Sequence, residues 1–264
     1  MKFILKVSFA SAVFLILFVT TSFLNLVPEP YRVKTVVIDA GHGGKDPGCI
    51  GAIANEKDVT LKIAFKLGQY IEENIENVKV IYTRKTDDFV ELHERAAIAN
   101  RNNADLFISI HCNSSSPGVY GTETYTMGLH RTDANLKVAQ FENSSILLEE
   151  NYGYNYDGFD PNSPESYIIF SLFQNANLEK SISLASKVEL QMEQKAKRKS
   201  RGVKQAGFLV LYKTTMPSIM VETGFLTDKD EEQFLNSEEG QSYIASAIYR
   251  SFKDYKGEVE LSSN

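Results

Sequence analysis

The chain has 264 residues, of which 43% are hydrophobic and 23% are charged, and its net charge is −6. This length and composition are typical of one substantial globular domain and exclude a disordered chain. The negative charge argues against a general affinity for nucleic acid. The two cysteines, Cys49 and Cys112, are too few for a disulfide framework.

The first 30 residues differ from the rest of the chain. Lys2 and Lys6 precede an uncharged apolar stretch over 7–27, which is the layout of an export signal. Its densest part has the length of a signal-peptide core, but the full stretch is also long enough to cross a bilayer, which takes ~20 residues. We therefore expect 1–30 to be a cleaved signal peptide or an N-terminal membrane anchor, and the rest of the chain to be exported.

Beyond a proline-bearing break, apolar runs alternate with helical patterns. In 56–74, for example, Val59, Ile63 and Leu67 share one helical face. The patterns predict, in chain order, a strand at 35–41, a helix at 56–74, a strand at 78–84, a helix at 90–103, strands at 105–112 and 119–127, a helix at 177–200, strands at 207–212 and 217–225, and a last helix over about 231–256.

Strands that are continuous apolar runs and alternate with helices are typical of a mostly parallel sheet covered on both faces. We therefore expect 31–264 to form a single α/β domain, with a twisted, mostly parallel six-stranded sheet flanked by helices. Residues 129–176 interrupt the alternation with a polar segment rich in Asn and Glu. Helical patterns at 134–151 and 164–175 predict that this segment is a helical insertion.

Sites in such sheets form beyond the carboxyl ends of the strands, and this rule selects two histidines. His42 directly follows the first predicted strand, and His111 ends the third. Glu56 opens the first helix after a glycine-rich loop. Two histidines and one carboxylate are a common ligand set for catalytic zinc, with a fourth position left for water. A second carboxylate is then needed to move protons, and Glu222 is the candidate.

Each of these residues also has an ordinary explanation. A histidine at a strand end is often a simple hydrogen-bonded residue, and a glutamate at a helix start, such as Glu56, often serves only to complement the helix dipole. Glu222 is more informative, because a carboxylate within an apolar strand is costly to bury unless it is paired or used. His93 is expected to be structural or exposed. For His130, at the start of the insertion, a functional role and an ordinary structural role both stay open.

Other catalytic motifs are absent from the sequence. The glycine-rich loop is not a P-loop, because no GK[ST] follows it, and Asp46 stands where a dinucleotide fingerprint needs its third glycine. Neither G-x-S-x-G nor H-E-x-x-H occurs. Cys112 is a poor candidate for a nucleophile activated by His111, because neighbouring residues on a strand point to opposite faces of the sheet.

Taken together, the motifs resemble the zinc-dependent N-acetylmuramoyl-L-alanine amidases of the AmiC type, also called amidase family 3. The resemblance extends over about 35–255 and rests on motifs in the family's order. These are "VVIDAGHGGKDPGCIG" at 36–51, Glu56–Lys57, Asp87, Arg95, "SIHCNS" at 109–114 and "VETGFLTD" at 221–228. Cys49 and Cys112 stand where small residues are usual, which removes no functional group.

The resemblance implies that 31–264 is a zinc amidase domain acting on peptidoglycan. Such an enzyme cuts the amide between the lactyl group of N-acetylmuramic acid and L-alanine. It implies one zinc ion bound by His42, Glu56 and His111, with Glu222 as the catalytic base and acid.

The insertion also has a counterpart in this family. Cell-division amidases of this type carry a helical segment that supplies a glutamate to the zinc until an activator protein displaces it. Glu142, Glu149 and Glu150 lie in a helical stretch suited to that role. We therefore expect 129–176 to be autoinhibitory, with a substrate-binding wall as the alternative.

Two other functions stay open. A zinc peptidase that cuts within the stem peptide would use the same residues, and only its products would differ. A non-catalytic peptidoglycan-binding protein is less consistent with the presence of all four catalytic positions. We expect the protein in the periplasm or cell envelope, held at the inner membrane if the N-terminal segment is retained.

Overall fold

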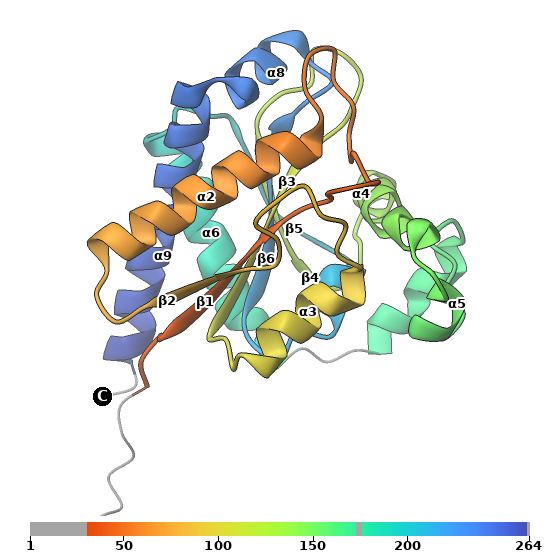
Figure 1. Ribbon diagram of the computed structural model, residues 1–264, viewed down its shortest axis with the longest axis horizontal. Helices are drawn as coiled ribbons and strands as arrows, with labels where there is room; N and C mark the ends of the chain where they lie inside the picture. Colours follow the sequence, from red (N-terminus) through yellow and green to blue (C-terminus); the bar gives the residue numbers. More distant parts are fainter. Residues whose placement is uncertain (1–30, 173–175, 263–264) are drawn as a thin grey trace, which may run out of the picture.

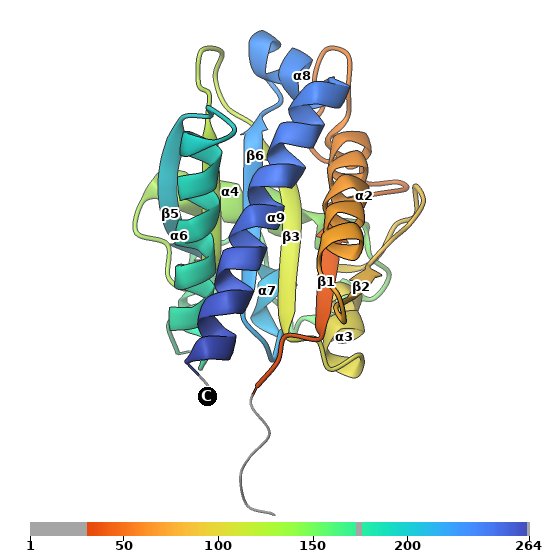
Figure 2. The same ribbon diagram turned by 90° about the vertical axis from the view of Figure 1, so that its left-hand side faces the viewer.

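The computed structural model describes residues 31–172 and 176–262, and its centre is a six-stranded sheet (Figures 1 and 2). The strand order is β2-β1-β3-β6-β4-β5. The strands are β1 (Thr35–Ala40), β2 (Lys79–Tyr82), β3 (Leu106–Asn113), β4 (Thr122–Met127), β5 (Ser200–Ala206) and β6 (Ser218–Phe225). The first four in the order are parallel, whereas β4 pairs antiparallel with β6 and parallel with β5. The predicted mostly parallel six-stranded sheet of a single α/β domain is confirmed.

Helices cover both faces of this sheet. Outside the insertion they are α2 (Glu56–Asn74), α3 (Leu92–Arg101), α6 (Leu178–Gln194), α7 (Leu209–Tyr212), α8 (Lys229–Asn236) and α9 (Glu238–Leu261). Figure 2 shows α2, α6 and α9 side by side on one face. Successive side chains of β1 point to opposite faces of the sheet and so belong to two separate parts of the core. Val36 and Ile38 pack on the face covered by α2, α6 and α9, whereas Val37 packs on the face covered by α3.

One predicted strand is wrong, and the sixth strand lies elsewhere. The apolar run 207–212 contains the short helix α7, and β5 begins at Ser200, where the long helix was predicted to end. A short apolar run fits a buried helix as well as a buried strand, so its pattern cannot separate the two. The strand β5 is a sheet edge with the polar sequence SRGVKQA and is mostly half-buried, so it lacks a strand's usual apolar signal.

The segment 129–176 contains four short helical elements on the side of the sheet that α3 also covers (Figure 1). They are α4 (Asp133–Asn143), the 3-10 helix η1 (Ser144–Leu148), α5 (Tyr152–Asn155) and the 3-10 helix η2 (Pro164–Leu172). The expected export segment, 1–30, lies outside the described residues. Within the described part of the chain, no helix has both the length and the apolar character needed to cross a membrane.

A buried ion pair joins α3 to β1 just below the predicted site. Arg95 donates to Asp39 at 2.8 Å and to the backbone carbonyl of His42 at 2.8 Å. Asp39 also accepts hydrogen bonds from Thr83 and Ser109, each at 2.6 Å. Burial raises the pKa of Asp39, but Arg95 and these hydroxyl groups outweigh it and hold the pKa below its usual value. The pair therefore fixes the point at which the chain leaves β1.

Replacing Arg95 by methionine should destabilise the fold strongly, because Asp39 would remain buried without its charged partner. We expect a loss of roughly 3–5 kcal/mol in the free energy of unfolding, measured by urea denaturation. The matched control is Arg101→Met on the same helix. The side chain of Arg101 is 54% exposed, so this substitution should change stability by less than about 1 kcal/mol. Equal losses in the two variants would contradict the role assigned to Arg95.

Candidate active site

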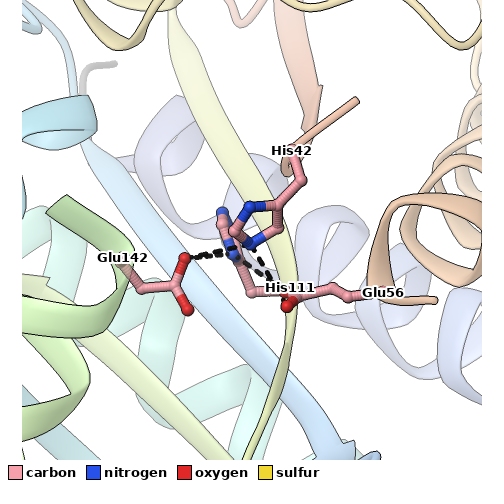
Figure 3. Close-up of side chains that lie close together, drawn as sticks. All are labelled: His42, Glu56, His111 and Glu142. Carbon is pink, nitrogen blue, oxygen red and sulfur yellow. Dashed lines mark ion pairs between the residues drawn. The ribbon is translucent and has the colours of Figure 1, made fainter. Parts of the chain in front are cut away.

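Four side chains from four parts of the chain meet in one buried cluster (Figure 3). His42 follows β1, His111 lies in β3, Glu56 opens α2, and Glu142 belongs to α4 of the insertion. One ligand atom of each lies within 4.8 Å of the other three. The structure thus brings together the three ligands predicted from sequence and one of the three candidate glutamates.

Glu56 is held at the centre by two backbone amides. Its Oε1 accepts a hydrogen bond from the Cys112 amide at 2.7 Å, and its Oε2 accepts one from the Cys49 amide at 2.8 Å. The same two oxygens lie 3.1 Å from Nδ1 of His111 and 3.2 Å from Nε2 of His42. Burial raises the pKa of Glu56, but the two histidines outweigh burial and lower it well below its usual range. Glu56 is therefore a carboxylate.

His42 is aimed at the cluster by a carboxylate that the sequence analysis did not assign to the site. Its Nδ1 donates to Oδ2 of Asp46 at 2.9 Å, which leaves Nε2 to face Glu56 and Glu142. Metal-binding histidines commonly have such a partner on the far ring nitrogen. Burial raises the pKa of Asp46, but His42 lowers it to about 2. His42 also has a φ of 59°, a left-handed conformation rare outside glycine and often found at functional sites.

Two glycines leave the space that these rings fill. A Cβ on Gly48 would lie 2.6 Å from Oε2 of Glu56, and Gly48 has a φ of +65°. A Cβ on Gly41 would lie 2.5 Å from Cε1 of His111. The glycine-rich loop therefore serves close packing of the cluster as well as the turn.

Glu142 closes the cluster from the side of the insertion. Its Oε2 lies 2.8 Å from Nδ1 of His111 and 3.2 Å from Nε2 of His42. The cavity that these residues line with Asp39 and Arg95 has a volume of about 10 Å³. That is the space of a single water molecule at most, so this cavity has no room for a substrate.

The cluster has the donor set of a metal site. Nε2 of His42, Nδ1 of His111 and Oε2 of Glu142 are buried and have no hydrogen-bond partner, although the distances between them are short. Buried polar atoms without hydrogen bonds are costly. Two imidazole nitrogens and carboxylate oxygens that point at one place are suited to zinc, so the residues present fit the ion.

The two histidines hold protons when no metal is bound. Burial lowers the pKa of His111, but the negative charges of Glu142 and Glu56 outweigh it and raise the pKa to about 10. The same balance, with Glu56 as the larger of the two charges, raises the pKa of His42 well above its usual value.

Glu222 lies beside this cluster on the neighbouring strand. It is the Cα partner of His111 across β3 and β6, its side chain is fully buried, and neither carboxylate oxygen has a hydrogen-bond partner. Burial and the charge of Glu142 raise the pKa of Glu222 well above its usual value, against the opposing effect of His111. Both effects favour the protonated, uncharged form of Glu222 in this closed state.

The remaining candidates lie away from the cluster. Glu149 accepts hydrogen bonds from the Leu92 amide and the Tyr156 hydroxyl, each at 2.8 Å, and lies 3.6 Å from the ring of half-exposed His93. Glu150 is exposed. The side chain of Cys112 packs into the core on the α2 face, and burial raises the pKa of its thiol, which agrees with its rejection as a nucleophile.

Comparison with known proteins points to a hydrolase built on this α/β fold. A family model described as N-acetylmuramoyl-L-alanine amidase matches residues 36–254. Among curated proteins, Escherichia coli AmiC is 34% identical over 85% of this chain and 53% of its own length. An uncharacterized protein of Bacillus subtilis, YqiI, is 33% identical over 86% of this chain and 87% of its own.

Solved structures give the same result. The amidase AmiC2 of Nostoc punctiforme is 34% identical, with a TM-score of 0.60 over 84% of this chain and 96% of its own. An amidase of Clostridium difficile is 27% identical, with a TM-score of 0.62 over 85% of this chain and 97% of its own. The chain belongs to the amidase 3 family of N-acetylmuramoyl-L-alanine amidases, which are hydrolases of peptidoglycan.

Metal uptake by this cluster should release protons and strengthen with rising pH. The metal needs neutral imidazoles, whereas His111, with a pKa of about 10, and His42 are protonated at neutral pH. The apparent zinc affinity should therefore rise as the pH rises toward about 10. Titration calorimetry at pH 7 in two buffers of different ionisation enthalpy measures the released protons directly. Binding heats that do not depend on the buffer would contradict this assignment.

Proposed function

We propose that the amidase works as a zinc enzyme, with His42, Glu56 and His111 as ligands and Glu222 as the general base and acid. The observation that carries the proposal is the meeting of buried donor atoms without hydrogen bonds at one place, beside a buried carboxyl group on the next strand. When bound, zinc supplies an acidified water and polarises the scissile carbonyl.

Glu222 moves the proton in this scheme. After burial, the negative charge of Glu142 is the largest cause of the raised pKa of Glu222. When Glu142 leaves the cluster, this charge is removed, the pKa of Glu222 falls, and Glu222 can ionise. It then accepts a proton from the attacking water and gives it to the amine of L-alanine as the amide breaks. Asp46 holds the ring of His42 through this cycle.

The substitution Glu222→Gln should separate catalysis from metal binding. We expect a loss of roughly 100- to 10,000-fold in turnover, because the proton carrier is removed, while the bound zinc measured by mass spectrometry stays near that of the wild type. The substitution His111→Ala should abolish both turnover and zinc binding.

The products released from purified sacculi identify the bond that is cut. An amidase releases stem peptides with a free L-alanine amine, which mass spectrometry detects. Cleavage inside the stem peptide would instead support a peptidase.

The position of Glu142 supports autoinhibition by the insertion. A catalytic zinc needs one open position for water or substrate, whereas four protein ligands are typical of a closed, structural site. Glu142 reaches both histidines and leaves a cavity of only about 10 Å³. We therefore propose that Glu142, rather than Glu149 or Glu150, holds the site closed.

Separate contacts hold the inhibitory segment in place. Ser145 donates to Asp46 at 2.7 Å, and Asn143 bonds to the backbone of Gly207 and Leu209 at 2.7 and 2.8 Å. Glu149 accepts from the Leu92 amide, at the start of α3. Opening the site therefore requires these hydrogen bonds to break, which supports a partner protein as the trigger.

Replacing Glu142 by alanine should activate the enzyme. If the open state is a minor population, removal of the closing ligand should raise activity on sacculi roughly tenfold or more. The control is Glu150→Ala, which changes an exposed glutamate of the same segment and should leave activity unchanged. Equal rates for the wild type and the Glu142→Ala variant, with the zinc site filled in both, would favour a substrate-binding wall.

The cellular setting follows from the substrate. We propose that residues 1–30 direct export to the periplasm or cell envelope, as a cleaved signal or a retained anchor, where peptidoglycan lies. A related amidase of Clostridioides difficile, CwlD, has a structure in complex with the GerS lipoprotein. We propose an activator protein for this chain as well, and the segment 129–176 as its target.

A further inference from the structure

A second, open cleft lies beside the buried cluster, at the end of β4 and β5. Its volume is about 470 Å³, far larger than the closed cavity at the histidines. The residues that give it its chemistry are Asn113, Glu123, Phe141, Arg201, Lys204 and Phe225. The cleft is large enough for part of a peptide chain. Its floor is formed by β4, β5 and β6, and one wall is formed by α4 of the insertion, through Lys137, Val138 and Phe141.

The sheet register places this cleft next to the proposed catalytic carboxyl group. His111, Glu222 and Glu123 are Cα partners in a row across β3, β6 and β4, so their side chains share one face of the sheet. Lys204 on β5 is the partner of Tyr125, two residues beyond Glu123 on β4. Glu123 is therefore one strand spacing, about 5 Å, from Glu222, and the cleft continues the site along the sheet.

A β-bulge turns Arg201 toward the same place. Thr122 pairs with Ser200 and Thr124 pairs with Val203, so two residues of β5 stand opposite one residue of β4. Gly202 takes the unusual conformation there, with a φ of +86°. Bulges near sites often redirect a side chain, and here the redirected guanidinium reaches Glu123 at 2.6 Å.

The cleft has more positive than negative charge at this point. Arg201 and Lys204 both contact Oε1 of Glu123, each at 2.6 Å, and Tyr125 donates to the other oxygen at 2.7 Å. One carboxylate thus balances two cations. The two cationic side chains are 32% and 22% exposed, so they remain open to the cleft, and one positive charge is left for an anionic ligand.

We propose that Arg201 and Lys204 form a subsite for the free α-carboxylate of the second residue of the stem peptide. This inference rests on the proposed amidase site. In peptidoglycan the second residue is a glutamate joined through its γ-carboxyl group, so its α-carboxylate is free. That group lies within about 7 Å of the scissile amide along an extended chain. Glu123, which contacts both cations, lies on the strand next to Glu222, so the two cations are on the side of the site toward which the stem peptide can extend.

If the subsite exists, two substitutions should change the affinity for the acidic ligand in opposite directions. A purely structural ion pair would not have this effect. Lys204→Gln removes a cation and should weaken binding of the acid. Glu123→Gln removes the internal competitor and frees both cations, so binding of the acid should become tighter. Lys199→Gln, an exposed lysine just before β5, is the matched control and should change nothing.

Binding is measured with the full, zinc-loaded chain carrying Glu142→Ala and Glu222→Gln, so that the site is open and the ligand is not cleaved. The probes are two disaccharide tripeptides, one with the free α-carboxylate and one with that group amidated. We expect the acid to bind roughly tenfold or more tightly than the amide, as for a charged hydrogen-bonded pair. Lys204→Gln should abolish this preference, Glu123→Gln should enlarge it, and Lys204→Arg should retain it.

Equal affinities for the two probes, no detectable binding of either, or a preference unchanged by Lys204→Gln would overturn the subsite. Thermal melts of each variant confirm folding, and Lys204→Arg keeps the test informative if Lys204→Gln unfolds. Cleavage by the Glu142→Ala enzyme is a separate readout. Failure to cleave either probe would count against the proposed function, whereas cleavage of both at equal rates would count against the subsite alone.

Discussion

The structure of the site depends on the position of one carboxylate, that of Glu56. Two backbone amides, from Cys49 and Cys112, fix its two oxygens, and each oxygen then faces a different histidine. Because the first amide belongs to the glycine-rich loop and the second to β3, the carboxylate joins the loop, the sheet and the start of α2. The interval from His42 to Glu56 exists so that the loop can bring both residues to one place.

The same arrangement makes closure easy to achieve. Three residues of the proposed metal site come from the sheet domain, and the fourth, Glu142, comes from an insertion held by its own hydrogen bonds. Under the proposed function, a shift of α4 would remove Glu142 and leave the other three residues where they are. Opening would then free one coordination position and lower the negative charge beside Glu222.

The sequence alone predicted the sheet and most of its helices, because β1, β3 and β6 are apolar runs and α2 has a clear helical period. It also selected His42, Glu56, His111 and Glu222, since strand ends and an unusual buried carboxylate are visible in the pattern. It could not separate Glu142 from Glu149 and Glu150, because that choice depends on how α4 packs. Asp46 and Glu123 gave no pattern of their own, and β5 was missed because an edge strand with polar residues resembles the end of a helix.

The charges of the closed cluster have a consequence for the way in which a metal ion would enter it. Asp46, Glu56 and Glu142 each lie within 3.2 Å of a ring nitrogen of the two histidines, and negative charges raise the pKa of both imidazoles. A metal ion that enters the cluster must displace the protons that these charges favour. Loading would therefore be an exchange of cations at a site that is already arranged, with the imidazole protons as its first occupants.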